Sequence, residues 1–130
     1  MKAKARLAIF IVALFFSTGI AFAEPISTQE MLSACRDISK AETNGKTVRL
    51  HPNFNTGMCW GAFAVLQDTI GIVVDNKPFL GVCTPKGSTM TQLISVFVNY
   101  AEKNPQRLHE PFFIVAIDSL LEVFKCPKGP

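Results

Sequence analysis

The chain has 130 residues, of which 48% are hydrophobic, and it carries 13 Lys and Arg against 10 Asp and Glu. Three of the basic residues lie within the first six positions, so the part from residue 24 onward is balanced at ten charges of each sign. This length fits one small domain. A neutral domain argues against nucleic-acid binding, because contacts with phosphates supply most of the affinity of such proteins.

Residues 1–23 have the pattern of a secretory signal peptide. A positively charged start precedes the almost wholly apolar residues 7–20, and residues 21–24 (AFAE) form a small-x-small cleavage site. The apolar run is shorter than the roughly 20 residues that a membrane-spanning helix needs. We expect cleavage after Ala23, which leaves residues 24–130 as the mature domain. An uncleaved membrane anchor is the alternative.

The first predicted helix of the mature domain spans residues 28–43. Ser27 and Glu30 match a capping box, and apolar residues then recur at helical spacing. Asn44-Gly45 is a stop signal, because glycine readily takes the left-handed conformation that ends many helices. The turn formers that follow predict a connecting loop over residues 46–56.

The second predicted helix spans residues 58–74, although its end is rich in β-branched residues. The apolar run is longer than the usual strand of about 4–8 residues. Gln67, Asp68 and Thr69 also cluster where one face of a helix would meet solvent. A turn is predicted at residues 75–78, followed by a short extended segment at 79–83.

The third predicted helix follows a turn at residues 85–87. Ser88 or Thr89 can cap it, and Asn104-Pro105 ends it after Lys103, because the residue before a proline avoids the helical region.

The fourth predicted helix begins near Pro111, since proline suits a first helical turn, and Cys126-Pro127 closes it. Apolar residues cover more than half of its circumference, so we expect it to be the central helix. The sequence therefore predicts an all-α fold, a small four-helix domain.

Four cysteines lie in the mature domain, and an even number in a small exported domain predicts two disulfides. They are Cys35, Cys59, Cys83 and Cys126. Their spacing does not match a zinc site, and a cysteine in a disulfide cannot act as a nucleophile. We therefore predict no metal, no cofactor and no catalytic residue.

Two other patterns suggest chemistry only weakly. Lys86 precedes Gly87, the reverse of the order in a phosphate-binding P-loop. Asp118 and Glu122 would lie on one face of the fourth helix, which is more typical of a solvated stripe than of a catalytic pair. A small crosslinked domain of this kind is typical of a binding or structural protein rather than an enzyme.

The mature chain resembles the Rap/Tai family of exported immunity proteins, which protect bacteria from type VI secretion toxins. The resemblance is carried by short stretches in order along the chain: residues 31–35 (MLSAC), 59–63 (CWGAF), 83–89 (CTPKGST) with Gln92-Leu93, Tyr100 with Asn104-Pro105, Leu108, Pro111, and 124–127 (FKCP). Phe63 departs from the pattern, because the family commonly has tyrosine there, and the loop at 46–56 has no family motif.

The resemblance implies a helical periplasmic protein, often a homodimer, that binds a peptidoglycan-cleaving amidase and blocks its active site. The rival hypothesis is a small periplasmic stress chaperone or structural protein of the acid-stress type. No nucleic-acid partner and no stable membrane anchor are expected.

Four cysteines allow three pairings. We favour Cys35–Cys59, which would join the first two helices, and Cys83–Cys126, which would join the start of the third helix to the end of the fourth. For partner binding we favour two polar loops, because rigid scaffolds often present recognition residues on loops. The candidates are Asp75, Asn76 and Lys77 in one loop, and Asn104, Gln106, Arg107, His109 and Glu110 in the other.

Overall fold

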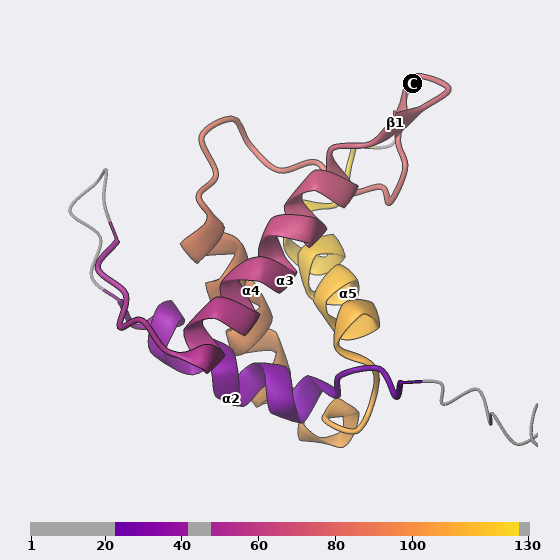
Figure 1. The fold of residues 1–130 in the computed structure, drawn as a ribbon. Coiled ribbons are helices and arrows are strands. Elements are labelled where there is room, and N and C mark those ends of the chain that lie inside the picture. The colour runs from indigo at the N-terminus through magenta and orange to yellow at the C-terminus, as the bar shows by residue number, and fades with distance from the viewer. Residues whose placement is uncertain (1–22, 42–47, 128–130) are drawn as a thin grey trace, which may run out of the picture.

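The computed structural model describes residues 23–41 and 48–127 (Figure 1). The predicted all-α fold is confirmed: the described residues form four α-helices, one short 3-10 helix and one small hairpin. In the labels of Figure 1 these are α2 (Thr28–Ser39), α3 (Phe54–Ile70), β1 (Val73–Val74), β2 (Lys77–Pro78), α4 (Met90–Lys103), η1 (Pro105–Arg107) and α5 (Phe112–Phe124). The predicted signal segment up to residue 22 and the predicted stop at Asn44-Gly45 lie outside the described residues.

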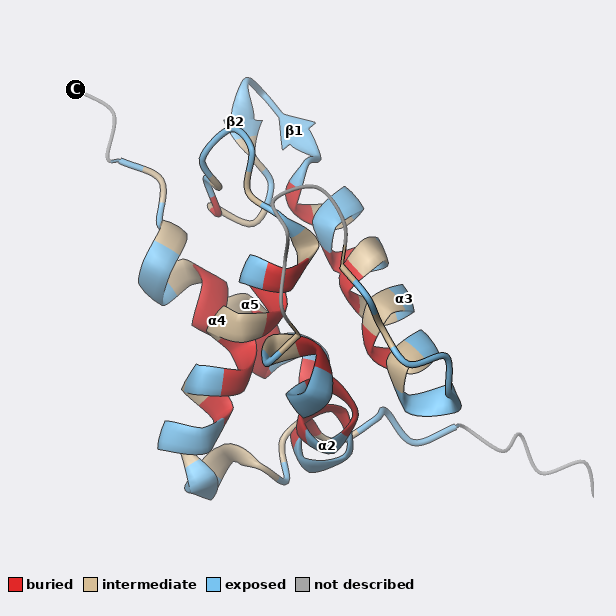
Figure 2. Cartoon of the chain, turned by 90° about the vertical axis from the view of Figure 1, so that its left-hand side faces the viewer, coloured by how far each residue is buried: buried red, intermediate tan, exposed pale blue. Residues whose placement is uncertain are grey.

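Helix α4 is the centre of the domain. It packs against α2, α3 and α5, and it contacts η1 at its end. The prediction that the last helix is central was wrong. One side of α5 is open to solvent, where Phe113 is 39% and Ile114 is 51% exposed. Figure 2 shows the buried residues gathered on the facing sides of the four helices.

The core is organised by three phenylalanines from three helices. Phe63 of α3, Phe97 of α4 and Phe112 of α5 are all buried. Their ring centroids are 5.6, 5.6 and 5.2 Å apart, and the Phe97–Phe112 pair is edge-to-face. Tilted and edge-to-face arrangements suit the charge distribution of aromatic rings. These contacts therefore fix the relative positions of α3, α4 and α5.

Helix α2 begins as the sequence predicts and ends earlier. The Ser27 hydroxyl accepts a hydrogen bond from the Glu30 amide, and the Glu30 side chain accepts one from the Ser27 amide, so the capping box is confirmed. The helix ends at Ser39 rather than near residue 43. The Ser39 hydroxyl donates to the Arg36 carbonyl, and the Ala41 amide donates to the Ile38 carbonyl. These hydrogen bonds, each between residues three apart, close the last turn of the helix.

Helix α3 is displaced four residues toward the N-terminus relative to the prediction. It begins at Phe54, because the Asn53 side chain accepts a hydrogen bond from the Thr56 amide and caps it. It ends at Ile70, and Val73–Val74 form a strand instead of a last helical turn. The turn formers at 53–57 are thus a helix start, and the β-branched residues at 72–74 belong to the hairpin.

The start of α4 agrees with the prediction that Ser88 or Thr89 caps it, and Thr89 is the cap. Thr89 caps the helix by accepting from the Gln92 amide, and the Gln92 side chain accepts from the Thr89 amide. The chain turns into this cap at Lys86 and Gly87, and Gly87 has φ +86. That backbone conformation favours glycine.

Both favoured disulfides are confirmed. Cys35–Cys59 joins α2 to α3, and Cys83–Cys126 joins the segment before α4 to the end of α5. Val82 pairs with Lys125 in an isolated bridge next to the second disulfide. At the other end of the domain, Ser27 pairs with Pro111 in the same way.

We predict that Phe97→Ala destabilises the fold by about 3–5 kcal/mol, because it removes one ring from the core cluster and leaves a cavity. The matched control is Phe79→Ala, since Phe79 is 60% exposed and lies on the hairpin rather than in the core. It should change the free energy of unfolding by no more than about 0.5 kcal/mol. Urea denaturation of both variants measures the difference. Equal losses in the two would contradict this account of the core.

Candidate protein-binding surface

A two-stranded hairpin connects α3 to the segment that leads into α4. Val74 faces Lys77 and Val73 faces Pro78, so Asp75 and Asn76 form a two-residue loop. Both loop residues have positive φ, 49° and 59°, as a tight turn matched to the twist of the strands requires. Asp and Asn tolerate this conformation better than most residues. The hairpin shape is therefore set locally.

The hairpin exposes an unusual amount of apolar surface. Ile72, Val73, Val74 and Phe79 are 47%, 62%, 49% and 60% exposed. The hairpin stands away from the helices in Figure 1, and Figure 2 shows its strands as exposed. Single exposed apolar residues are common, but a cluster on one projecting element is typical of a protein-binding surface.

Sequence reasoning placed Asp75, Asn76 and Lys77 in an exposed turn, and all three are exposed. The sequence prediction does not identify the exposed apolar residues on either side, because it ends the second helix at residue 74 and begins an extended segment at residue 79. The signal was present in the sequence. Two valines stand before Asp75-Asn76, and paired β-branched residues around such a dipeptide indicate a hairpin.

The second foot of the hairpin is fastened to the end of α5. Val82 is buried in the core. The Cys83 amide donates to the Phe124 carbonyl at 2.7 Å, and the Cys126 amide donates to the Gly81 carbonyl at 3.0 Å. The Cys83–Cys126 disulfide lies at the same place. We call these contacts between residues 81–83 and 124–126 the clasp.

The other predicted loop, residues 104–110, is tied together by Arg107. Its guanidinium donates to both carboxylate oxygens of Glu110, at 2.9 and 2.7 Å, and to Asp118 of α5 at 2.8 Å. It also donates to the Tyr100 hydroxyl of α4 at 2.8 Å, with its centre 5.8 Å from that ring. One side chain therefore joins α4, η1 and α5.

These contacts shift the pKa values of Glu110 and Arg107. The hydrogen bonds from Arg107 hold the pKa of Glu110 below its ordinary value of 4.5. The carboxylates of Glu110 and Asp118 raise the pKa of Arg107, and Glu110 has the larger effect. Asn104 also bonds within the domain, donating to the Tyr100 carbonyl. Of the predicted partner-binding residues in this loop, Gln106 and His109 are the exposed ones.

The two predicted loops do not form one surface. The hairpin lies at the top of the molecule in both Figure 1 and Figure 2, and the connection between α4 and α5 lies at the bottom. The helical domain separates them. A partner that contacts the hairpin therefore does not contact Gln106 or His109 through the same compact interface.

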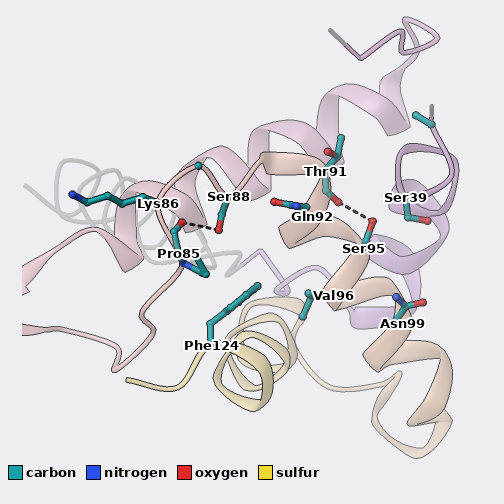
Figure 3. Close-up of a pocket in the computed structure, with 12 residues that line it drawn as sticks. Ser39, Pro85, Lys86, Ser88, Thr91, Gln92, Ser95, Val96, Asn99 and Phe124 are labelled. Atoms are coloured by element: carbon teal, nitrogen blue, oxygen red, sulfur yellow. Dashed lines mark hydrogen bonds between the residues drawn. The ribbon is translucent and has the colours of Figure 1, made fainter. Parts of the chain in front are cut away.

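A polar groove of about 550 Å³ runs along α4 (Figure 3). Its hydroxyls are largely used by the backbone: Ser88 donates to the Pro85 carbonyl, and Ser95 donates to the Thr91 carbonyl. Lys86 and Asn99 lie at opposite ends of the groove. Ligand sites usually have polar groups that converge, and these side chains are spread out.

The outward face of α3 is apolar without being covered by the described helices. Residues 54–67 contain no charged side chain. Phe54, Gly57, Gly61 and Val65 follow one another at helical spacing, and all four are exposed. Beside the glycines lies an apolar hollow of about 680 Å³, to which Trp60 contributes. An apolar helix face that stays exposed is typical of an interaction surface.

Within residues 23–41 and 48–127, no group of three or more His, Cys, Asp or Glu side chains is placed to hold a metal ion. In the same part of the chain, none of the helices combines the length and apolar character needed to cross a membrane.

Comparison with known proteins gives one family. The model of the family described as Rap1a immunity proteins matches residues 27–126, which is most of the chain and includes all four cysteines. Searches of curated proteins and of solved structures gave no match.

We predict that acid weakens the domain through Glu110. Because its folded-state pKa lies below the ordinary value of 4.5, its stabilising contribution is complete above that value and is lost as the pH falls through the folded-state pKa. Glu110→Gln should lower the melting temperature at about pH 7 and make the fall toward about pH 3 shallower. Glu122→Gln, an exposed site on α5, is the control. The same dependence of melting temperature on pH in wild type and Glu110→Gln would contradict the prediction.

Proposed function

The chain belongs to the Rap1a immunity protein family, and we propose that it neutralises a type VI secretion toxin of the peptidoglycan amidase class by binding it and blocking its active site. The observation that carries this proposal is the hairpin at residues 72–79. It projects from a crosslinked domain, exposes four large apolar side chains and presents Asp75, Asn76 and Lys77 at its tip and second strand.

The proposed mechanism is occlusion without catalysis. The apolar side chains Val73, Val74 and Phe79 would form the desolvated centre of the interface, and the polar residues at 75–77 would lie at its rim, as in typical protein–protein interfaces. The clasp holds the second foot of the hairpin before binding. Such preorganisation reduces the entropy lost on association, so a small surface can bind tightly.

Export to the periplasm completes the proposal. We propose that residues 1–23 are a signal peptide cleaved after Ala23, and that residues 24–130 act in the periplasm. The two disulfides support this location, because such bonds form and persist in oxidising compartments. An amidase that cleaves peptidoglycan would also meet its inhibitor there.

We further propose a homodimer through the outward face of α3. Phe54 and Val65 project at the ends of this face, and the small residues Gly57 and Gly61 lie between them. Neither glycine has a neighbouring atom within 4 Å of the position a Cβ would take. In an antiparallel pair related by a two-fold axis, Phe54 of one copy would lie near Val65 of the other. Because Gly57 and Gly61 have no side chains, the two helices could then approach closely.

The acid-stress chaperone is the second candidate function, and the same exposed apolar residues are the observation in its favour. A chaperone of that type needs apolar surface that opens in acid. The buried Cys35–Cys59 disulfide and the clasp oppose such opening. A holdase assay at about pH 3 with an unfolded client tests it, and protection of the client there would favour this function over toxin binding.

Two equally exposed valines separate toxin binding from self-association. Val73 of the hairpin and Val65 of α3 are each 62% exposed. We predict that Val73→Asp weakens binding to a secreted amidase encoded beside this chain at least about tenfold, because a charge enters the desolvated interface. Val65→Asp should leave that affinity unchanged and convert a dimer to a monomer. Calorimetry and light scattering measure the two quantities.

Val73→Asp should keep the wild-type melting temperature, since Val73 is not in the core. Val65→Asp should melt at the temperature that the wild-type protein has at concentrations where it is monomeric. Wild-type affinity in Val73→Asp would exclude the hairpin as the contact. Absence of binding by wild type to such an amidase, together with no loss of protection when the gene is deleted, would overturn the proposed function itself.

A further inference from the structure

The two disulfides differ sharply in their access to solvent. Cys35 and Cys59 are both 0% exposed and lie in the core. Cys83 is exposed, and Cys126 is half-buried. Thiol–disulfide exchange requires a thiolate to reach one of the two sulfurs. A small dithiol can therefore reach the Cys83–Cys126 bond in the folded protein, whereas Cys35–Cys59 is protected until the core opens.

The accessible disulfide is also the one that fixes the hairpin. The first foot of the hairpin continues directly from α3, whose last residue, Ile70, is buried. The second foot has no helix to support it until Met90. Between these points it is held by buried Val82 and by the clasp. Breaking the disulfide removes the one covalent part of that support.

We propose that the Cys83–Cys126 disulfide is a redox-sensitive clasp, whose reduction loosens the hairpin and weakens its binding to the toxin. The statement about toxin binding rests on the function proposed above. The statement about the hairpin does not, because it follows from the exposure of Cys83 and from the contacts at residues 81–83 and 124–126.

The reducing agent belongs to the class of dithiols, either a small molecule or a thiol–disulfide oxidoreductase. One of its thiolates attacks the Sγ of Cys83, the exposed residue of the pair, forms a mixed disulfide and releases Cys126 as a thiolate. Its second thiol then displaces Cys83 and forms an intramolecular disulfide. The dithiol loses two electrons and two protons, and Cys83 and Cys126 end as two thiols.

The clasp would then restrict full toxin binding to oxidising compartments. A chain that has not been oxidised lacks the covalent tie, although the buried helix contacts and the two backbone hydrogen bonds of the clasp remain possible. Full affinity for the toxin would be reached only after oxidation, which is the condition of an exported protein.

The test begins with the oxidised wild-type protein and graded dithiothreitol, a small dithiol. Alkylation followed by mass spectrometry identifies which cysteines become free. We expect Cys83 and Cys126 to be modified at dithiol concentrations at least about tenfold below those that expose Cys35 and Cys59. Simultaneous reduction of both bonds, or earlier reduction of Cys35–Cys59, would overturn the proposal.

Hydrogen exchange on the selectively reduced protein measures the loosening. Faster exchange is expected at the amides of Cys83 and Cys126, which bond across the clasp, and at the amide of Phe79, which donates to the Ile72 carbonyl at 2.8 Å. The buried amides of α4 are the internal control and should stay protected. Unchanged exchange at Phe79, Cys83 and Cys126 would overturn the proposal even if the bond is reduced.

The Cys83→Ser, Cys126→Ser double variant reproduces the open clasp without a reducing agent. We expect its affinity for the amidase to fall at least about tenfold. The affinity of the selectively reduced wild-type protein should fall by the same factor. This second measurement keeps the test valid if the variant folds poorly. If only oxidised wild type binds, the clasp is supported. If oxidised wild type binds no amidase, the proposed function fails, and the exchange data still decide whether the clasp holds the hairpin.

Discussion

Three phenylalanine rings from three helices contact one another, and this cluster sets the arrangement that the other features require. Phe63, Phe97 and Phe112 bring α3, α4 and α5 together around α4. Helix α2 is then joined to α3 by the buried Cys35–Cys59 disulfide. In the chain-entropy model, a crosslink over 24 residues stabilises by about 3–4 kcal/mol, a large share of the stability of a small domain. Because the core is fixed in this way, the two ends of the domain can serve different purposes.

One end is used to hold the fold together. Arg107 draws Glu110, Asp118 and Tyr100 into one set of hydrogen bonds, and the bridge between Ser27 and Pro111 closes the same region onto the start of α2. Because these charged groups already form hydrogen bonds with one another, a contact with a partner would first have to break one of those bonds. The net gain in binding free energy would therefore be small. The opposite end has exposed apolar side chains on the hairpin, whose burial by a partner would be a gain.

The features that the sequence predicted well depend on residues close together in the chain. The capping box at Ser27–Glu30, a cap at Ser88 or Thr89 and the turn at Asp75-Asn76 are of this kind, as are the proline boundaries. The limits of α3 were wrong because Asn53 can act as a turn former or as a helix cap, and the β-branched run at 72–74 suits a helix end or a strand. The roles of Arg107 and of the central helix were not predictable, because they depend on contacts between separate helices.

The placement of the exposed apolar residues is the strongest support for the proposal that the hairpin binds the partner. Val73, Val74 and Phe79 keep about half or more of their surface in water, and burial of that surface by a partner would be favourable. They lie on an element whose turn is defined locally by Asp75 and Asn76 and whose second foot is held by the clasp. An apolar surface that is exposed and also held in a fixed shape is suited to one complementary partner. A chaperone instead needs surface that adapts to many clients.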